Sequence, residues 1–176
     1  MSMTMKYLMA VTAFAGAMTC AASFAQAGKD SPLSASGLPV PRYVSLKSDH
    51  VNVRVGPTKD NDVAWVYTRA GLPVEVTAEF ENWRRVRDSE GAEGWVYHSL
   101  LSGRRTAVVI MKDKDELAPL YERATAGSAV VARLQAGVVA QVRRCDMKWC
   151  RIVGSGFDGW IEKLQLWGVY ADEQVN

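Results

Sequence analysis

The chain has 176 residues, which is enough for one ordinary domain or two small ones. Hydrophobic residues make up 48% of it and charged residues 23%, values that are ordinary for globular proteins and exclude a wholly disordered chain. The formal net charge is only +2 and no run of Lys and Arg is longer than a pair, so the sequence argues against a nucleic-acid partner.

Residues 1–27 have the pattern of a secretory signal peptide. Lys6 is followed by an uncharged, Ala-rich stretch that ends at Ala25-Gln26-Ala27, a small-residue cleavage site. We therefore expect cleavage after Ala27 and an exported protein that is not inserted in the membrane. The alternative is a retained membrane anchor, because the uncharged stretch is nearly long enough to span a bilayer. Its Thr, Ser, Gly and Ala residues dilute the hydrophobicity and favour cleavage.

Residues 28–41 are rich in Ser, Pro and Gly and are predicted to form a flexible tether that ends near Arg42. Beyond the tether the sequence has no helical run. Short segments rich in Val, Trp and Tyr are interrupted by Gly, Asn and Asp, which is the pattern of a small all-β barrel or sandwich.

The remaining sequence contains an internal duplication. The apolar segment 71–76 matches 137–142, and Trp83 matches Trp149 at the same spacing. One residue is then lost, in a segment predicted to be a hairpin loop, before 94–96 matches 159–161. We therefore expect two repeats, at residues 42–105 and 106–176.

Three motifs of the first repeat resemble those of the bacterial SH3 (SH3b-like) domain family. Val51–Pro57 is similar to the family's opening Asn-Val-Arg-x-Gly-Pro motif, Asn82–Val86 to its Trp strand, and Glu93–Val96 to its closing Gly-Trp-Val. The second repeat keeps the Trp strand and the closing motif, but Leu117–Arg123 departs from the opening motif. The resemblance implies two tandem small SH3-like β-barrels. It extends to exported Gram-negative proteins with paired SH3-like domains, which implies a periplasmic location.

The two repeats are joined by a very short connection. Only Gly103–Thr106 separates the end of the first repeat from the first apolar strand of the second. We therefore expect the two barrels to abut and to share a rigid interface. The apolar segment Trp167–Tyr170 is predicted to fold back onto it.

Cys145 and Cys150 are predicted to form a disulfide, the expected fate of an even pair of cysteines in an oxidising compartment. A two-residue turn at Met147-Lys148 places them directly opposite each other. A second register is left open, since a shared core face for Val142 and Ile152 favours an odd loop and a diagonal pair. In the first repeat the same two positions hold Glu79 and Arg84, for which we expect a cross-strand ion pair.

Few residues suggest catalysis. His50 and His98 have no metal-ligand spacing and are expected in exposed loops, so no metal, no cofactor and no enzymatic activity are predicted. A catalytic cysteine is the alternative role for the cysteine pair, because bacterial SH3 domains often accompany Cys–His peptidases. It requires a peptidase domain, for which the chain has no residues left.

The aromatic residues of the first repeat are the remaining candidates for function. Since Val86 is expected to point inward, Trp83, Arg85 and Arg87 are expected to share the opposite face of their strand, with Trp83 half-exposed. SH3-like barrels receive extended peptides in grooves lined by aromatic rings. The candidate groove consists of Tyr67, Trp83, Arg85, Arg87 and Tyr97. The alternative is that these aromatic rings belong to the core.

These observations leave two function classes. The first is a non-catalytic module of the periplasm or cell envelope that binds peptidoglycan peptide or an extended segment of an envelope protein. The family resemblance, rather than the residues, implies this cell-wall role. The second is a structural scaffold without a small-ligand groove. The exposure of Trp83 separates them, because a buried Trp83 favours the scaffold.

Overall fold

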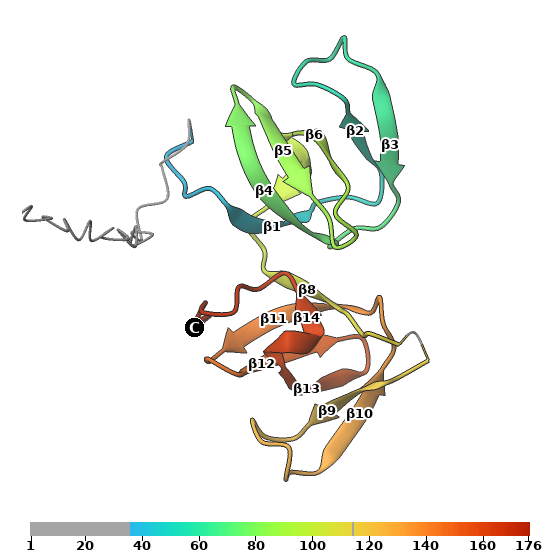
Figure 1. Cartoon of the computed structure of the whole chain (residues 1–176), viewed down its shortest axis with the longest axis vertical. Helices are drawn as coiled ribbons and strands as arrows, with labels where there is room; N and C mark the ends of the chain where they lie inside the picture. Colours follow the sequence, from blue (N-terminus) through green and yellow to red (C-terminus); the bar gives the residue numbers. More distant parts are fainter. Residues whose placement is uncertain (1–35, 114) are drawn as a thin grey trace, which may run out of the picture.

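The structure is a computed structural model that describes residues 36–113 and 115–176 (Figure 1). The predicted signal peptide and most of the predicted tether therefore lie outside the described residues. The described residues form two seven-stranded antiparallel sheets, which confirms the expected all-β class and the tandem barrels. Within these residues no helix is both long and apolar enough to cross a bilayer.

The two sheets repeat the same topology. Barrel one contains β1 (Arg42–Leu46), β2 (Val51–Arg54), β3 (Val63–Tyr67), β4 (Pro73–Phe80), β5 (Trp83–Arg87), β6 (Glu93–Tyr97) and β7 (Leu101–Ser102). Barrel two contains β8 (Thr106–Val109), β9 (Ala118–Tyr121), β10 (Val130–Leu134), β11 (Val139–Cys145), β12 (Trp149–Gly154), β13 (Phe157–Glu162) and β14 (Leu166–Trp167). The strand orders are β3-β2-β6-β5-β4-β1-β7 and β10-β9-β13-β12-β11-β8-β14, so each strand of barrel two has its counterpart in barrel one.

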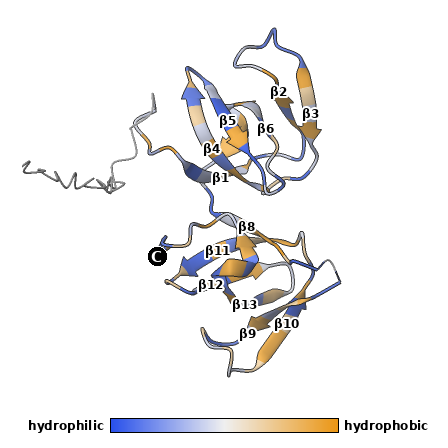
Figure 2. Ribbon diagram, in the orientation of Figure 1, coloured by the Kyte–Doolittle hydropathy of each residue, from blue (hydrophilic) through white to orange (hydrophobic). Residues whose placement is uncertain are grey.

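Each barrel has its own apolar core, to which alternate residues of the strands contribute. Figure 2 shows hydrophobic stretches on strands of both barrels. Val51 and Val53 of β2 are fully buried, whereas Asn52 and Arg54 between and after them point outward. At Gly94 of β6 an added Cβ would lie 2.4 Å from the Val53 side chain. The closing motif therefore needs glycine where β6 crosses β2.

A β-bulge in barrel two settles the register of the hairpin that carries the cysteines. The β11–β12 ladder pairs Val142 with Ile152 and then shifts by one residue, so that Cys145 lies directly opposite Cys150. The two sulfur atoms are bonded at 2.00 Å, which agrees with the predicted disulfide, and the diagonal register is wrong. Val142 can therefore pair with Ile152 and Cys145 with Cys150, because the extra residue of β11, Arg143, lies between the two pairs.

The same bulge occurs in barrel one. Glu79 and Arg84 lie opposite each other in the β4–β5 ladder, and their Oε1 and Nε atoms are 2.9 Å apart, which confirms the predicted ion pair. Glu79 also accepts hydrogen bonds from the amide and hydroxyl of Ser36. The described end of the predicted tether is therefore attached to barrel one at Ser36.

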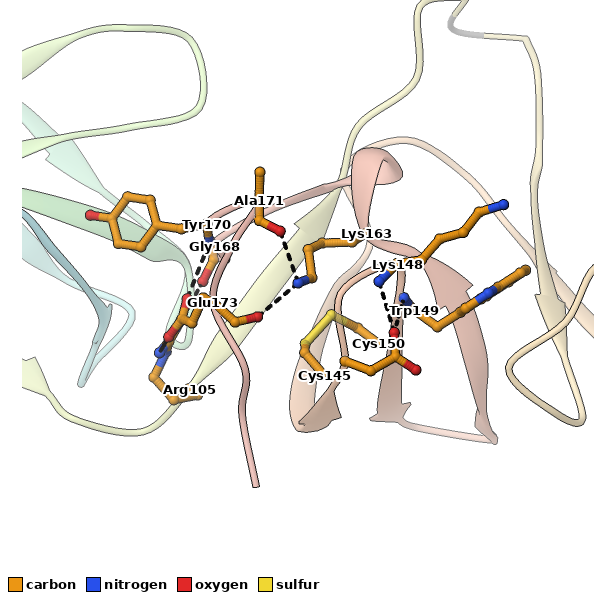
Figure 3. The surroundings of a disulfide bond; sticks show 11 residues. Arg105, Cys145, Lys148, Trp149, Cys150, Lys163, Gly168, Tyr170, Ala171 and Glu173 are labelled. Atoms are coloured by element: carbon orange, nitrogen blue, oxygen red, sulfur yellow. Dashed lines mark hydrogen bonds and ion pairs between the residues drawn. A yellow bond between two sulfur atoms is a disulfide. The ribbon is translucent and has the colours of Figure 1, made fainter. Parts of the chain in front are cut away.

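The C-terminal tail, Gly168–Asn176, is held on barrel two at three points, of which the contacts of Lys163 and of Arg105 are drawn in Figure 3. Val175 exchanges backbone hydrogen bonds of 2.8 and 3.1 Å with Cys145. The buried Lys163 ammonium donates to the carbonyls of Ala171 and Glu173. The carboxylate of Glu173 forms an ion pair with Arg105. These contacts fix the path of the tail beside the disulfide.

From this position the tail reaches barrel one, as the sequence predicted. Tyr43 of β1 contacts the rings of Trp167 and Tyr170, with centroids 5.4 and 4.6 Å apart. The hydroxyl of Tyr170 donates to Glu75 of β4 at 2.9 Å. Arg69 adds a hydrogen bond to the carbonyl of Gly137 in barrel two. The barrels thus meet through aromatic rings, and the partly buried Tyr170 hydroxyl is satisfied.

Candidate functional site

Barrel one has a pocket of about 310 Å³ on its outer face. We call it the barrel-one pocket; its lining residues are Asn52, Arg54, Lys59, Trp83, Tyr97, Ser99 and Leu100. They come from β2, the β2–β3 loop, β5, the end of β6 and the short 3₁₀ turn His98–Leu100.

Trp83 and Tyr97 form the aromatic part of the pocket. They lie opposite each other in the β5–β6 ladder, and their rings meet edge to face with centroids 5.4 Å apart. Trp83 is only 7% exposed, so the expectation of a half-exposed ring is wrong. Alternation does place it on the outer face, but Tyr97 from the neighbouring strand packs against it there. Tyr97 itself is half-buried.

Arg54 and Lys59 form the cationic part of the pocket. One N–H group of Arg54 donates to the carbonyl of Asn61 at 2.6 Å, which holds the side chain along the β2–β3 loop. The ammonium of Lys59 lies 6.0 Å from the centre of the Tyr97 ring. Within the described residues neither cation forms an ion pair.

Sequence reasoning missed Asn52, Arg54 and Lys59 as pocket residues. The signal for the first two was the opening motif itself, because buried valines on β2 leave Asn52 and Arg54 on the outer face. Lys59 had no such signal, since its position depends on the path of the β2–β3 loop.

The other predicted groove residues do not line this pocket. Tyr67 packs against Trp65 and donates its hydroxyl to Asp88 at 2.9 Å, in a separate hollow of about 210 Å³. Burial raises the pKa of Tyr67, and the negative charge of Asp88 raises it further. Arg85 pairs with Glu93 at 2.6 Å. The structure therefore brings Trp83 and Tyr97 together and leaves Tyr67 apart.

Arg87 is also engaged elsewhere. Its guanidinium contacts the carboxylate of Glu75 at 2.5 and 3.0 Å, next to the interface between the barrels. The hydrogen bond and the charge of Glu75 raise the pKa of Arg87. Arg87 thus donates to the same carboxylate, that of Glu75, to which Tyr170 of the tail donates.

Barrel two presents different side chains at the equivalent place. Trp149 is 6% exposed and lies opposite Glu162, where barrel one has Tyr97. Its ring is covered by that of Tyr121, with centroids 5.5 Å apart. Tyr121 lies opposite Trp160 of the closing motif, just as Arg54 lies opposite Trp95 in barrel one. Lys148 lies 3.8 Å from Glu162, so the cation there is neutralised.

A larger cleft of about 570 Å³ lies between the barrels. Three arginines line it, and each is already paired: Arg42 and Arg84 with Glu79, and Arg105 with Glu173. Because its cations are neutralised within the protein, this cleft offers less to a charged ligand than the barrel-one pocket does.

The described residues contain no group of three His, Cys, Asp or Glu side chains that could hold a metal ion. His50 and His98 are exposed, as predicted, and the ring of His98 lies beside Tyr97 with centroids 5.0 Å apart. What the barrel-one pocket offers chemically is an aromatic wall beside two cations, which suits an anionic ligand with an apolar part.

The comparison with protein families agrees with this fold. The sequence profile of the bacterial SH3 domain matches residues 47–103 and 114–168. No curated protein matches the sequence.

Similar solved structures include NlpC2 from Trichomonas vaginalis, with 14% identity over 72% of this chain and 48% of that chain, at a TM-score of 0.32. NlpC1 from Trichomonas vaginalis is 16% identical over 76% of this chain and 48% of its own, at a TM-score of 0.31. An NlpC/P60 family protein from Bacillus cereus is 11% identical over 71% of this chain and 55% of its own, at a TM-score of 0.30. The chain spans about half the length of these proteins. On the profile match, the chain belongs to the bacterial SH3 domain family and carries two such domains in tandem.

Proposed function

We propose that this protein is a non-catalytic binding module of the cell envelope, which holds peptidoglycan peptide or an extended segment of an envelope protein in the barrel-one pocket. The observation that carries the proposal is the pocket itself, with Trp83 and Tyr97 beside Arg54 and Lys59. Membership of the bacterial SH3 family supports a binding role, and the family's cell-wall roles support the location by analogy.

The proposal includes export to the periplasm with loss of the leader after Ala27, which the composition of residues 1–27 supports. N-terminal sequencing of the protein from the periplasmic fraction is expected to begin at Gly28. An intact leader in the membrane pellet would show a retained anchor.

Retention on purified peptidoglycan sacculi, measured beside a pull-down from periplasmic lysate, tests the binding role. Tyr97→Ala removes the half-buried ring of the pocket and is expected to lower retention. Leu164→Ala is the control, because Leu164 is 84% exposed on barrel two, outside the pocket. Equal retention on sacculi, together with equal capture from the lysate, by both variants and the wild type contradicts the proposal.

A structural scaffold is the second candidate, and the burial of Trp83 favours it. It predicts that partner capture depends on the contact between the barrels rather than on the pocket. Tyr170→Ala removes a ring and a hydrogen bond from that contact and leaves the pocket intact. If Tyr170→Ala loses binding while Tyr97→Ala keeps it, the scaffold explains the protein better.

A further inference from the structure

We infer that the barrel-one pocket selects peptides that end in a free carboxylate, which Arg54 and Lys59 receive beside the aromatic pair. This inference rests on the proposed function and names its ligand class. It starts from an imbalance of charge, because the pocket is lined by two cations and no carboxylate. Asp60 and Asp62 follow Lys59 in the loop, but within the described residues neither forms an ion pair with it.

The imbalance is combined with an aromatic pair in this pocket, whereas a second hollow, lined by Lys47 and Arg104 and likewise by no carboxylate, has no aromatic ring. The neighbouring arginines of β5 each face a glutamate: Arg84 faces Glu79, and Arg85 faces Glu93. The outward arginines of β5 are thus neutralised by glutamates of the neighbouring strands. Arg54 and Lys59 line the pocket without an ion pair among the described residues, so their charge is available to a ligand.

The donors of the pocket suit a carboxylate. A guanidinium has five N–H groups, and only one of those of Arg54 is used within the described residues, in the bond to Asn61. The remaining ones can form a charge-assisted pair with both oxygens of a carboxylate. The Asn52 amide and the Ser99 hydroxyl line the same pocket and add uncharged donors. Tyr97 offers a flat surface for the apolar part of the ligand.

The size of the pocket favours the end of a chain over its middle. A volume of about 310 Å³ is at the lower end for ligand pockets, which measure roughly 300–1,000 Å³. Such a space suits one or two terminal residues. The terminal carboxylate is also the one negative charge that a peptide carries whatever its side chains are.

Barrel two is an internal comparison. There Tyr121 stands where Arg54 stands in barrel one, and Glu162 where Tyr97 stands. A glutamate at the position of the ring repels a second carboxylate and already neutralises Lys148. We therefore assign carboxylate recognition to barrel one alone.

Titration of the isotope-labelled full chain with acetyl-lysyl-D-alanyl-D-alanine, followed by amide NMR, tests the inference. Amide shifts are expected at Trp83, Tyr97 and Ser99, and the C-terminal amide of the same peptide is expected to bind about tenfold or more weakly. The all-L peptide separates the two sources of the carboxylate. Stronger binding of the D form indicates peptidoglycan, and equal or stronger binding of the L form indicates a protein C-terminus.

Matched variants test whether Arg54 and Lys59 bind the carboxylate. Arg54→Gln and Lys59→Gln are each expected to weaken binding about tenfold. Lys47→Gln and Arg133→Gln remove the same charges at exposed positions outside the pocket and are expected to bind as wild type. Added salt is expected to weaken binding of the acid more than that of the amide.

The outcomes separate the inference from the proposed function. If sacculi retain the protein through Tyr97 while acid and amide peptides bind equally, the carboxylate inference fails and the proposed function stands. If Arg54→Gln and Lys59→Gln behave like their controls, the inference also fails. If no peptide shifts the pocket residues and sacculus and lysate capture are both independent of Tyr97, both fail.

Discussion

Arg105 occupies in barrel two the position that Arg42 occupies in barrel one. Arg42 lies opposite Val76, the core residue before the bulge of β4. The carbonyl of Arg105 accepts a hydrogen bond from Val142, the core residue before the bulge of β11. Both arginines form an ion pair, but the two carboxylates come from different parts of the chain.

In barrel one the carboxylate belongs to Glu79, at the tip of the hairpin. The equivalent residue of barrel two is Cys145, which the disulfide leaves unable to pair with an arginine. Glu173 of the tail forms the ion pair with Arg105 instead, because backbone hydrogen bonds at Val175 hold the tail beside the hairpin. Burial is the largest single influence and works to raise the pKa of Glu173. The hydrogen bonds from Arg105 and the Tyr170 amide, with the charges of Arg105 and Lys163, together outweigh it, and the net pKa lies below its ordinary value. The disulfide hairpin therefore positions the segment that reaches barrel one.

Reduction of the disulfide, or the double substitution Cys145→Ser and Cys150→Ser, is expected to lower the free energy of unfolding by about 2 kcal/mol, the stabilisation expected from closing a short loop. The tail should loosen with it, because Cys145 holds Val175. Urea unfolding and hydrogen exchange of the Val175 amide measure both effects. Thiol titration of the native mature protein is expected to find no free thiol before reduction. Reactive thiols without reductant would rule the bond out.

The sequence predicted the fold and the duplication because the repeated Trp and Gly-Trp motifs mark equivalent strands. It also predicted the fold-back of the tail, since an apolar segment after a complete barrel has only the interface to pack against. It left the cysteine register open because the bulge at Arg143 is visible only in the strand pairing. A bulge needs no characteristic residue type, so the local sequence carries no signal for it.

The site was predicted less well for a similar reason. Alternation along β5 assigned Trp83 to the outer face correctly, but the ring is buried by Tyr97, fourteen positions later in the chain. Tyr67 was placed in the same groove by its residue type, whereas it points to Asp88. Burial on a sheet face depends on the neighbouring strands, and the period along one strand does not contain that information.

Gly94→Ala and Gly159→Ala are both expected to destabilise the protein by about 1–3 kcal/mol, the usual cost of overpacking. An added Cβ would lie 2.4 Å from Val53 at Gly94 and 2.8 Å from Leu120 at Gly159. Gly103→Ala is the control, because nothing lies within 4 Å of its added Cβ. Thermal melts of the three variants measure the difference, and equal melting temperatures would contradict the close approach of the strands.

The contact between the barrels is expected to weaken in alkali. Burial, followed by the charge of Glu75, raises the pKa of Tyr43 from 10.0 to about 12. Burial and the hydrogen bond to Glu75 raise the pKa of Tyr170 as well. The folded state thus favours the neutral phenols. The contribution of the Tyr43 phenol is complete below pH 10 and is lost as the pH rises through about 12.

Ultraviolet titration of tyrosinate, beside unfolding curves at rising pH, measures this loss. Tyr43→Phe keeps the ring contacts and removes the ionising group, so it should be less sensitive to alkali than the wild type. Tyr121→Phe, on barrel two away from the interface, is the control. If Tyr43→Phe and the wild type lose stability at the same pH, the phenol of Tyr43 does not limit the contact.

Trp83→Ala and Trp149→Ala are expected to cost about 3–5 kcal/mol of stability each, because both rings are more than nine-tenths buried. Their effects on binding should differ. Trp83 lines the barrel-one pocket, whereas Trp149 is covered by Tyr121 beside the ion pair of Lys148 and Glu162. At a temperature where both variants remain folded, Trp83→Ala should lose sacculus binding and Trp149→Ala should keep most of it. Near-ultraviolet circular dichroism identifies the folded range, and Trp83→Phe, which keeps an aromatic ring, should recover part of both losses. Equal binding by the two alanine variants would show that Trp83 serves the fold alone.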